Sequence, residues 1–171
     1  MRARTVQSWS LACVLAGVAL LTPIPAAASD LAWARTGPEG GYVRSLAVHP
    51  HDASVVFAGT IDGVYRSADG GLTWLRSNTG IGNRTARTII INPQLPEQMF
   101  ALVWGEGELF RSDDGGETWH SLDHWGRYSH PYLQFSATPF ELYLSVDGTR
   151  FRSADSGTSW AEMTNIPDEA G

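Results

Sequence analysis

Ser67-Ala68-Asp69-Gly70-Gly71-Leu72-Thr73-Trp74 is one of three copies of the same eight-residue pattern. The other copies are Ser112-Asp113-Asp114-Gly115-Gly116-Glu117-Thr118-Trp119 and Ser153-Ala154-Asp155-Ser156-Gly157-Thr158-Ser159-Trp160, and successive copies start 45 and then 41 residues apart. A second landmark keeps the same phase, because His49-Pro50, Asn92-Pro93 and Thr138-Pro139 follow one another at 43 and 46 residues. Two landmarks in phase at this spacing indicate propeller blades or comparable stacked units.

Each repeat contains four short runs with the alternation and the turn residues of β-strands. Four antiparallel strands in each unit match the number of strands in a propeller blade. The sequence therefore predicts an all-β protein with three four-stranded antiparallel blades, at about 41–77, 85–122 and 131–163. The expected strands are 42–48, 55–60, 64–67 and 73–76, then 86–91, 98–104, 108–112 and 118–122, then 132–136, 142–146, 150–153 and 159–163.

The pattern Ser-x-Asp-x-Gly-x-Thr-Trp resembles the Asp-box, or BNR repeat, of sialidases, sortilin-type receptors, xyloglucan-cleaving glycoside hydrolases and photosystem II stability and assembly factors. Its chemistry suits a structural role, because the aspartate accepts hydrogen bonds from the turn backbone. The last glycine of the turn suits positive φ, and the tryptophan supplies a large apolar face. The positions expected to be structural are Ser67, Asp69, Gly71, Trp74, Ser112, Asp114, Gly116, Trp119, Ser153, Asp155, Gly157 and Trp160.

The sequence around the first copy narrows the group of proteins that the chain resembles. The stretches 37–41, 57–60 and 63–67 are most similar to exported bacterial propellers related to the photosystem II assembly factors and to the xyloglucanase-like group. The families that share this scaffold do unrelated things on it, so the resemblance implies the fold more directly than the function.

Composition agrees with a turn-rich β protein and argues against nucleic-acid binding. The chain has 171 residues, 18 glycines, 7 tryptophans and a net charge of −6, and all 12 of its basic residues are arginines. An acidic chain lacks the basic footprint of a general nucleic-acid binder. We therefore expect no nucleic-acid partner.

The first 28 residues have the order of a secretory signal peptide. Arg2 and Arg4 precede an apolar run over 11–21, and small residues at 26–28 provide a cleavage site. The run is too short to span a bilayer stably, so we expect no membrane span after cleavage. Removal of 1–28 would leave residues 29–171 with a net charge of −8 and without Cys13, the chain's single cysteine. We expect a secreted or periplasmic protein that folds without disulfides.

Residues 31–36 resemble the fourth strand of a blade, with Trp33 in the place of Trp74. The sequence thus predicts three blades and an orphan N-terminal outer strand. Closed propellers have about four to eight blades, so this arrangement is an incomplete or open arc. Open blade edges invite pairing with another chain, and we expect either a truncated propeller or self-association.

One face of the arc should collect the turns after the second strands and the connections between blades. It carries carboxylates, arginines and aromatics that suit a carbohydrate or a protein or peptide ligand. The predicted ligand-binding residues are Glu39, Asp62, Arg84, Arg87, Glu106, His124, Trp125, Arg127, His130 and Asp147. Turn chemistry alone would also explain Asp62-Gly63 and Asp147-Gly148, which are common hairpin dipeptides. The histidines lack a diagnostic metal-ligand spacing, so we expect no metal and no cofactor.

Asp62 is the candidate catalytic residue, since 60–66 resemble a segment of xyloglucanase-like enzymes that carries a catalytic aspartate. Hydrolysis needs a second carboxylate across the sugar, which in those enzymes comes from another propeller domain. The Arg-Ile-Pro motif of sialidases does not occur here. The favoured function is a non-catalytic binding or assembly module similar to the photosystem-factor relatives. The alternatives are a glycoside hydrolase or its truncated remnant, and a sortilin-like peptide-binding module.

Overall fold

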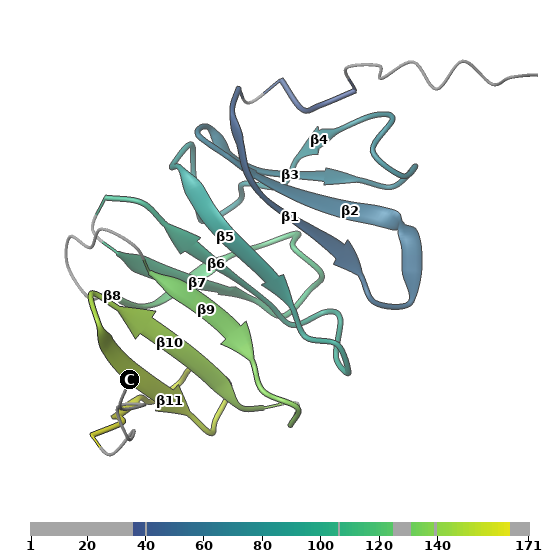
Figure 1. Cartoon of the computed structure of the whole chain (residues 1–171). Coiled ribbons are helices and arrows are strands. Elements are labelled where there is room, and N and C mark those ends of the chain that lie inside the picture. Colours follow the sequence, from purple (N-terminus) through teal and green to yellow (C-terminus); the bar gives the residue numbers. More distant parts are fainter. Residues whose placement is uncertain (1–35, 40, 106, 125–130, 139, 165–171) are drawn as a thin grey trace, which may run out of the picture. The chain divides into compact units, whose positions relative to one another are not determined.

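A computed structural model describes residues 36–39, 41–105, 107–124, 131–138 and 140–164. The expected signal peptide, and 31–35 of the expected orphan strand, lie outside the described residues. The described residues form only strands, turns and irregular segments (Figure 1), and no helix among them could cross a membrane.

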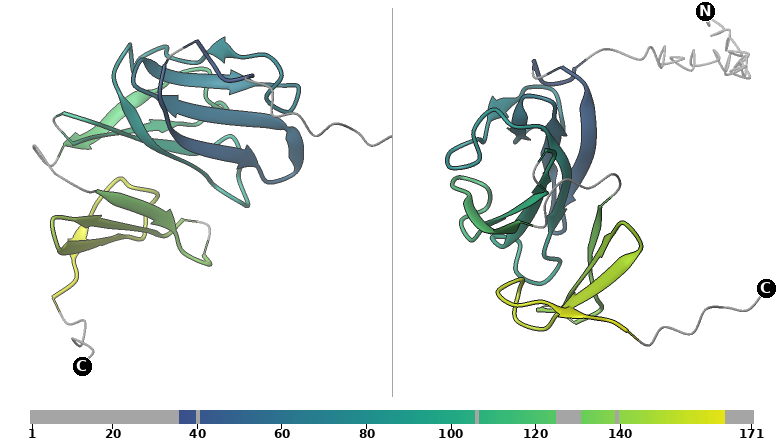
Figure 2. Two further views of the ribbon diagram at one scale, coloured as in Figure 1. Left: turned by 45° about the horizontal axis from the view of Figure 1, so that its top comes forward. Right: turned by 90° about the vertical axis from the view of Figure 1, so that its left-hand side faces the viewer.

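Within these residues, twelve strands form three separate four-stranded sheets, and in every sheet neighbouring strands are antiparallel and follow chain order. The views of Figure 2 show each sheet as an up-and-down meander. The strands are β1 (Val43–His49), β2 (Asp52–Thr60), β3 (Gly63–Ser67) and β4 (Leu75–Arg76), then β5 (Ala86–Ile91), β6 (Met99–Val103), β7 (Glu108–Ser112) and β8 (His120–His124), then β9 (Tyr132–Phe135), β10 (Leu142–Val146), β11 (Thr149–Ser153) and β12 (Ala161–Glu162). The predicted all-β fold with three four-stranded antiparallel sheets is confirmed.

The core consists of two apolar layers between successive sheets. Phe57 and Val64 of the first sheet meet Ile89, Met99 and Phe110 of the second. The opposite side of the second sheet contributes Phe100, Leu102 and Leu109 to a layer with Leu133, Leu142 and Leu144 of the third. All five residues of β6 are therefore buried, because its alternating side chains enter one layer or the other.

Several strand boundaries differ from the prediction, and three of them have an evident physical reason. β2 begins at Asp52 rather than at residue 55, since pairing with β1 continues past an irregularity after Val48 and joins His49 to Asp52. β4 has only two residues instead of the expected 73–76, because Asp69 holds the Thr73 backbone in the preceding turn. The fourth strand of the third sheet is shortened in the same way.

Candidate functional site

The three repeated turns have one hydrogen-bond pattern. In the first turn, the Ser67 hydroxyl donates to Asp69 (2.7 Å) and accepts the Gly71 N–H (2.8 Å), while Asp69 accepts the Thr73 N–H (2.9 Å). The second and third turns repeat these contacts from Ser112 and Ser153. The serine, the aspartate and the backbone therefore satisfy one another inside each turn.

These contacts stabilise the ionised aspartates. Hydrogen bonds from the Thr73 side chain and backbone, and then from Ser67, lower the pKa of Asp69 to about 2. Those from the Ser159 side chain and backbone, and then from Ser153, lower the pKa of Asp155 to about 2. A carboxylate that accepts several hydrogen bonds is held in its charged form, so these groups are acceptors for the fold.

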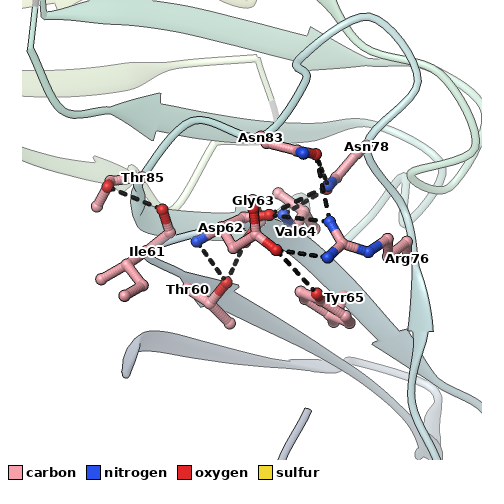
Figure 3. A network of polar contacts seen from close by, with 10 residues as sticks. All are labelled: Thr60, Ile61, Asp62, Gly63, Val64, Tyr65, Arg76, Asn78, Asn83 and Thr85. Atoms are coloured by element: carbon pink, nitrogen blue, oxygen red, sulfur yellow. Dashed lines mark hydrogen bonds and ion pairs between the residues drawn. The ribbon is translucent and has the colours of Figure 1, made fainter. Parts of the chain in front are cut away.

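Asp62 lies at the other end of the first sheet, in the turn between β2 and β3 (Figure 3). Its carboxylate pairs with Arg76 at 2.5 Å and contacts the Tyr65 hydroxyl at 3.5 Å. The Thr60 hydroxyl accepts the Asp62 N–H at 3.1 Å. The Asp62 side chain is thus committed to the turn in which it lies and to the outer strand of its own sheet.

Two arginines project from β-bulges at equivalent positions of neighbouring sheets. The pairing of β1 with β2 shifts between Val43 and Ser45, and that of β5 with β6 shifts between Ala86 and Thr88. Arg44 and Arg87 are the residues inside the two shifts. A bulge releases a side chain from the in-and-out alternation of a strand, and bulges are common beside binding sites for this reason.

Both arginines line one pocket of about 390 Å³, which we call the arginine pocket. Its lining comes from both sheets: Arg44, Ile61, Thr85, Arg87 and Trp104.

Backbone contacts fix the walls of the arginine pocket. The Thr85 carbonyl accepts the Trp104 N–H at 2.8 Å, and the Thr85 hydroxyl donates to the Ile61 carbonyl at 3.1 Å. The Arg87 guanidinium lies 4.6 Å from the centre of the Trp104 ring, within the range of a cation–π contact. Trp104 remains 53% exposed. The described lining has two cations and an accessible aromatic surface.

The other predicted ligand-binding residues are dispersed. Arg84 pairs with Glu108 and lies 5.5 Å from the Phe110 ring centre, outside the arginine pocket. Glu39 lines a separate hollow with Tyr65, Trp74 and Arg76. His124 ends β8 opposite Glu108, and Asp147 occupies the turn between β10 and β11 with a φ of 45°. Glu106, Trp125, Arg127 and His130 lie outside the described residues.

Of the lining residues the sequence interpretation named only Arg87, and it missed Arg44, Ile61, Thr85 and Trp104. Alignment of the repeats holds a signal for Arg44, because it is the first-sheet counterpart of Arg87. Trp104 directly follows β6, where the prediction extended the strand through residue 104 and so gave the side chain no role.

Two further features bear on ligands. Within the described part of the chain, no three His, Cys, Asp or Glu side chains gather where they could hold a metal ion. A pocket of about 480 Å³ lies by the second repeated turn, with Arg66, Glu97 and Asp114 in its lining. Asp114 is already bound within its turn.

Comparisons with known proteins bear on the fold. No protein-family model matches the chain, and no curated protein matches its sequence significantly. An ancestral GH74 enzyme has a similar structure, with a TM-score of 0.65 and 21% identity over 78% of this chain and 20% of that chain. The GH74 xyloglucanase from Xanthomonas campestris is also similar, with a TM-score of 0.57 and 20% identity over 74% of this chain and 23% of that chain. The structure of YCF48 bound to D1 peptide has a TM-score of 0.57 and 14% identity over 74% of this chain and 42% of that chain.

This chain therefore spans between about one fifth and two fifths of the length of these structures. The likeness supports a β-propeller fold, of which the three sheets form a part.

Proposed function

We propose that the chain is a non-catalytic binding module whose ligand is a polypeptide segment with an exposed carboxylate. The observation that carries this proposal is the pair of bulges that directs Arg44 and Arg87 into one pocket beside Trp104. Guanidinium groups form strong charge-assisted hydrogen bonds with carboxylates. The tryptophan ring offers an apolar surface for the adjoining residues of a peptide.

The charge of the arginine pocket favours an anionic ligand over a neutral polysaccharide. Arg44 and Arg87 both line it, although the whole chain carries a net charge of −6. A local positive site on an acidic protein selects anionic groups. The peptide bound in the YCF48 structure is a property of that protein, but it supports a peptide as the class of ligand to test first.

Glycoside hydrolysis is less well supported by the described residues. A hydrolase of this class needs two carboxyl groups facing each other across the scissile bond. Asp62 already contacts Arg76 and Tyr65, and the residues described in the lining of the arginine pocket include no carboxylate.

The proposal also covers the nature of the repeated turns and the relationship of the chain to known propellers. We regard the three repeated turns as structural Asp-boxes and the chain as an exported relative of the photosystem-factor-like propellers. Their serine–aspartate contacts, together with the signal-like order of residues 1–28, support this view.

Titration with two synthetic peptides tests the proposal. One probe is an acidic peptide with a free C-terminal carboxylate, and the other has the same sequence with its acids and C-terminus amidated. We expect calorimetry to detect only the first, with affinity falling as salt is raised. Loss of one charged hydrogen bond costs about 1.5–3 kcal/mol, so Arg44→Gln and Arg87→Gln should each weaken binding roughly 10- to 100-fold.

Arg66→Gln is the matched control. It removes the same charge, but Arg66 lines the pocket by the second repeated turn rather than the arginine pocket. Equal binding of both peptides, or equal losses in all three variants, would contradict the proposed site. Hydrolysis of xyloglucan that disappears in Asp62→Ala would favour the hydrolase instead.

A further inference from the structure

The three sheets can be aligned residue by residue, because their β-ladders have corresponding registers. Val56 pairs with Ser67, Met99 with Ser112 and Leu142 with Ser153, so Val56, Met99 and Leu142 are equivalent. We call the side of a sheet that packs on the preceding sheet its rear face, and the opposite side its forward face. The rear faces comprise Leu46, Val56, Ala58 and Tyr65 in the first sheet, Ile89, Met99, Ala101 and Phe110 in the second, and Leu133, Leu142, Leu144 and Phe151 in the third.

Each contact between sheets has an aromatic knob and a glycine socket. The forward face of the first sheet presents Phe57 to Gly116, where an added Cβ would meet the ring at 2.7 Å. The second sheet presents the equivalent Phe100 to Gly157, with a corresponding distance of 3.1 Å. The socket is in both cases the last glycine of the repeated turn in the next sheet, where φ is 87° or 80°.

The third sheet has a spare knob. Tyr143 is the residue equivalent to Phe57 and Phe100, since it directly follows Leu142 in the aligned register. It lines an open pocket of about 330 Å³ on the forward face, together with Tyr132, Gln134 and Arg150. The described residues include no fourth sheet to receive it.

The first sheet has a spare socket. Among the described residues, only Trp74 of the same turn would come within 4 Å of a Cβ on Gly71, at 3.5 Å. On the rear face Leu46 is 63% exposed, whereas the equivalent Ile89 and Leu133 are 3% and 2% exposed. The open part of this face lies along β1, because Ala58 and Tyr65 on β2 and β3 are already buried. The residue types match those of the two covered rear faces, so this surface has the chemistry of an interior one.

We propose that a second copy of this chain docks its forward third-sheet face on the rear face of the first sheet, with Tyr143 placed over Gly71. The contact continues the interface that the chain already forms twice within itself. Tyr143 supplies an apolar ring with a polar tip, and Leu46 and Val48 supply exposed apolar area. Two such contacts close a pair of chains with six sheets, within the range of about four to eight blades of closed propellers.

Docking has to displace the segment 36–39, which lies beside Tyr65 and Trp74, and to exchange one hydrogen bond of that segment. Trp119 donates to the Ser77 carbonyl at 2.8 Å, and Trp74 donates to the Thr36 carbonyl at 2.6 Å, so Thr36 occupies the place equivalent to Ser77. Met163 also matches Ser77, because their N–H groups donate to the equivalent carbonyls of Arg150 and Val64. In the docked pair, Met163 of the second copy takes the place of Thr36.

This forward face is more polar than its two counterparts. Gln134, Ser145 and Arg150 stand where the second sheet has Ile90, Leu102 and Leu109. We therefore expect reversible association that depends on concentration, rather than an obligate dimer.

Sedimentation of the purified chain over a range of concentrations tests the proposal. We expect the mass to rise from that of one chain to that of two. Leu46→Asp on the rear face and Tyr143→Ala on the forward face should each weaken association at least tenfold. Leu95→Asp, at an exposed apolar position outside both faces, should leave it unchanged. Circular dichroism and the melting temperature establish that each variant folds, and Val48→Ser replaces Leu46→Asp if the latter does not.

Mixing the two weakened variants provides the sharpest outcome. Each retains the face that the other has lost, so an equimolar mixture should regain one intact contact and form a one-to-one pair. A chain that stays monomeric at all concentrations would overturn the proposal. So would a dimer that is broken by Leu46→Asp but is unaffected by Tyr143→Ala, because such a dimer joins two rear faces.

Discussion

Ser112 performs two tasks with one hydroxyl group. It donates to Asp114 at 2.7 Å and accepts the N–H of Gly116 at 2.8 Å, and the side chain is fully buried. Ser112→Ala would leave a buried N–H without a partner, which costs about 1–3 kcal/mol. We expect the free energy of unfolding in urea to fall by that amount. Ser121→Ala, at an exposed position of β8, should change it by less than about 0.5 kcal/mol. Equal effects of the two changes would contradict the role of Ser112.

The turn aspartates should make the stability of the fold sensitive to acid. Asp69 and Asp155 have folded pKa values of about 2, below the ordinary value of 3.8. A lowered folded pKa gives stability that is complete above the unfolded pKa and is lost as the pH falls through the folded one. We therefore expect the melting temperature to fall between about pH 4 and pH 2. Asp155→Asn removes one titrating group, so its melting curve should depend less steeply on pH in that window. An unchanged slope would refute this account.

At the scale of an element, β10 and β6 carry equivalent aromatics in different surroundings. Phe100 in β6 is fully buried between the second and third sheets, whereas Tyr143 in β10 lies on the forward face of the last described sheet. Truncation of a buried phenylalanine costs about 3–5 kcal/mol, so Phe100→Ala should lower the unfolding free energy by this amount. Tyr143→Ala, measured at a dilution where the chain is monomeric, should cost much less. Similar losses would show that position in the repeat, rather than coverage, sets the cost.

Strands could be predicted wherever alternation and turn residues agreed. The expected 86–91, 108–112 and 142–146 are confirmed residue for residue as β5, β7 and β10. Short outer strands were overestimated, because propensity does not reveal that Asp69 and Asp155 bind the backbone of the residues that should begin them. The prediction that placed Arg87 at a binding face remains untested. Arg87 and Arg44 line the same pocket because of two bulges, and the alternation of apolar and polar residues does not reveal bulges.

Across the whole molecule, protection from solvent should follow the order of the sheets. Of the three described sheets, the second packs against another sheet on both faces and the first and third on one, so the amides of β6 should exchange hydrogen most slowly. In stacked repeats, stability depends on contacts between nearest neighbours. Hydrogen exchange at low protein concentration should therefore show faster exchange in β1–β2 and β10–β11 than in β6–β7. Raising the concentration should slow exchange in the rear face of the first sheet, but only if the proposed pair forms.

The aromatic–glycine pairing has a consequence for how such chains change in length. Each sheet brings its own ring on one side and its own glycine on the other, so every junction uses the same two parts. A duplicated or deleted unit would leave the remaining junctions chemically unaltered, as in other arrays whose units contact only their neighbours. The repeat is therefore a unit of evolution as well as of folding. A chain that gained or lost a whole unit would therefore still have matching surfaces at every remaining junction.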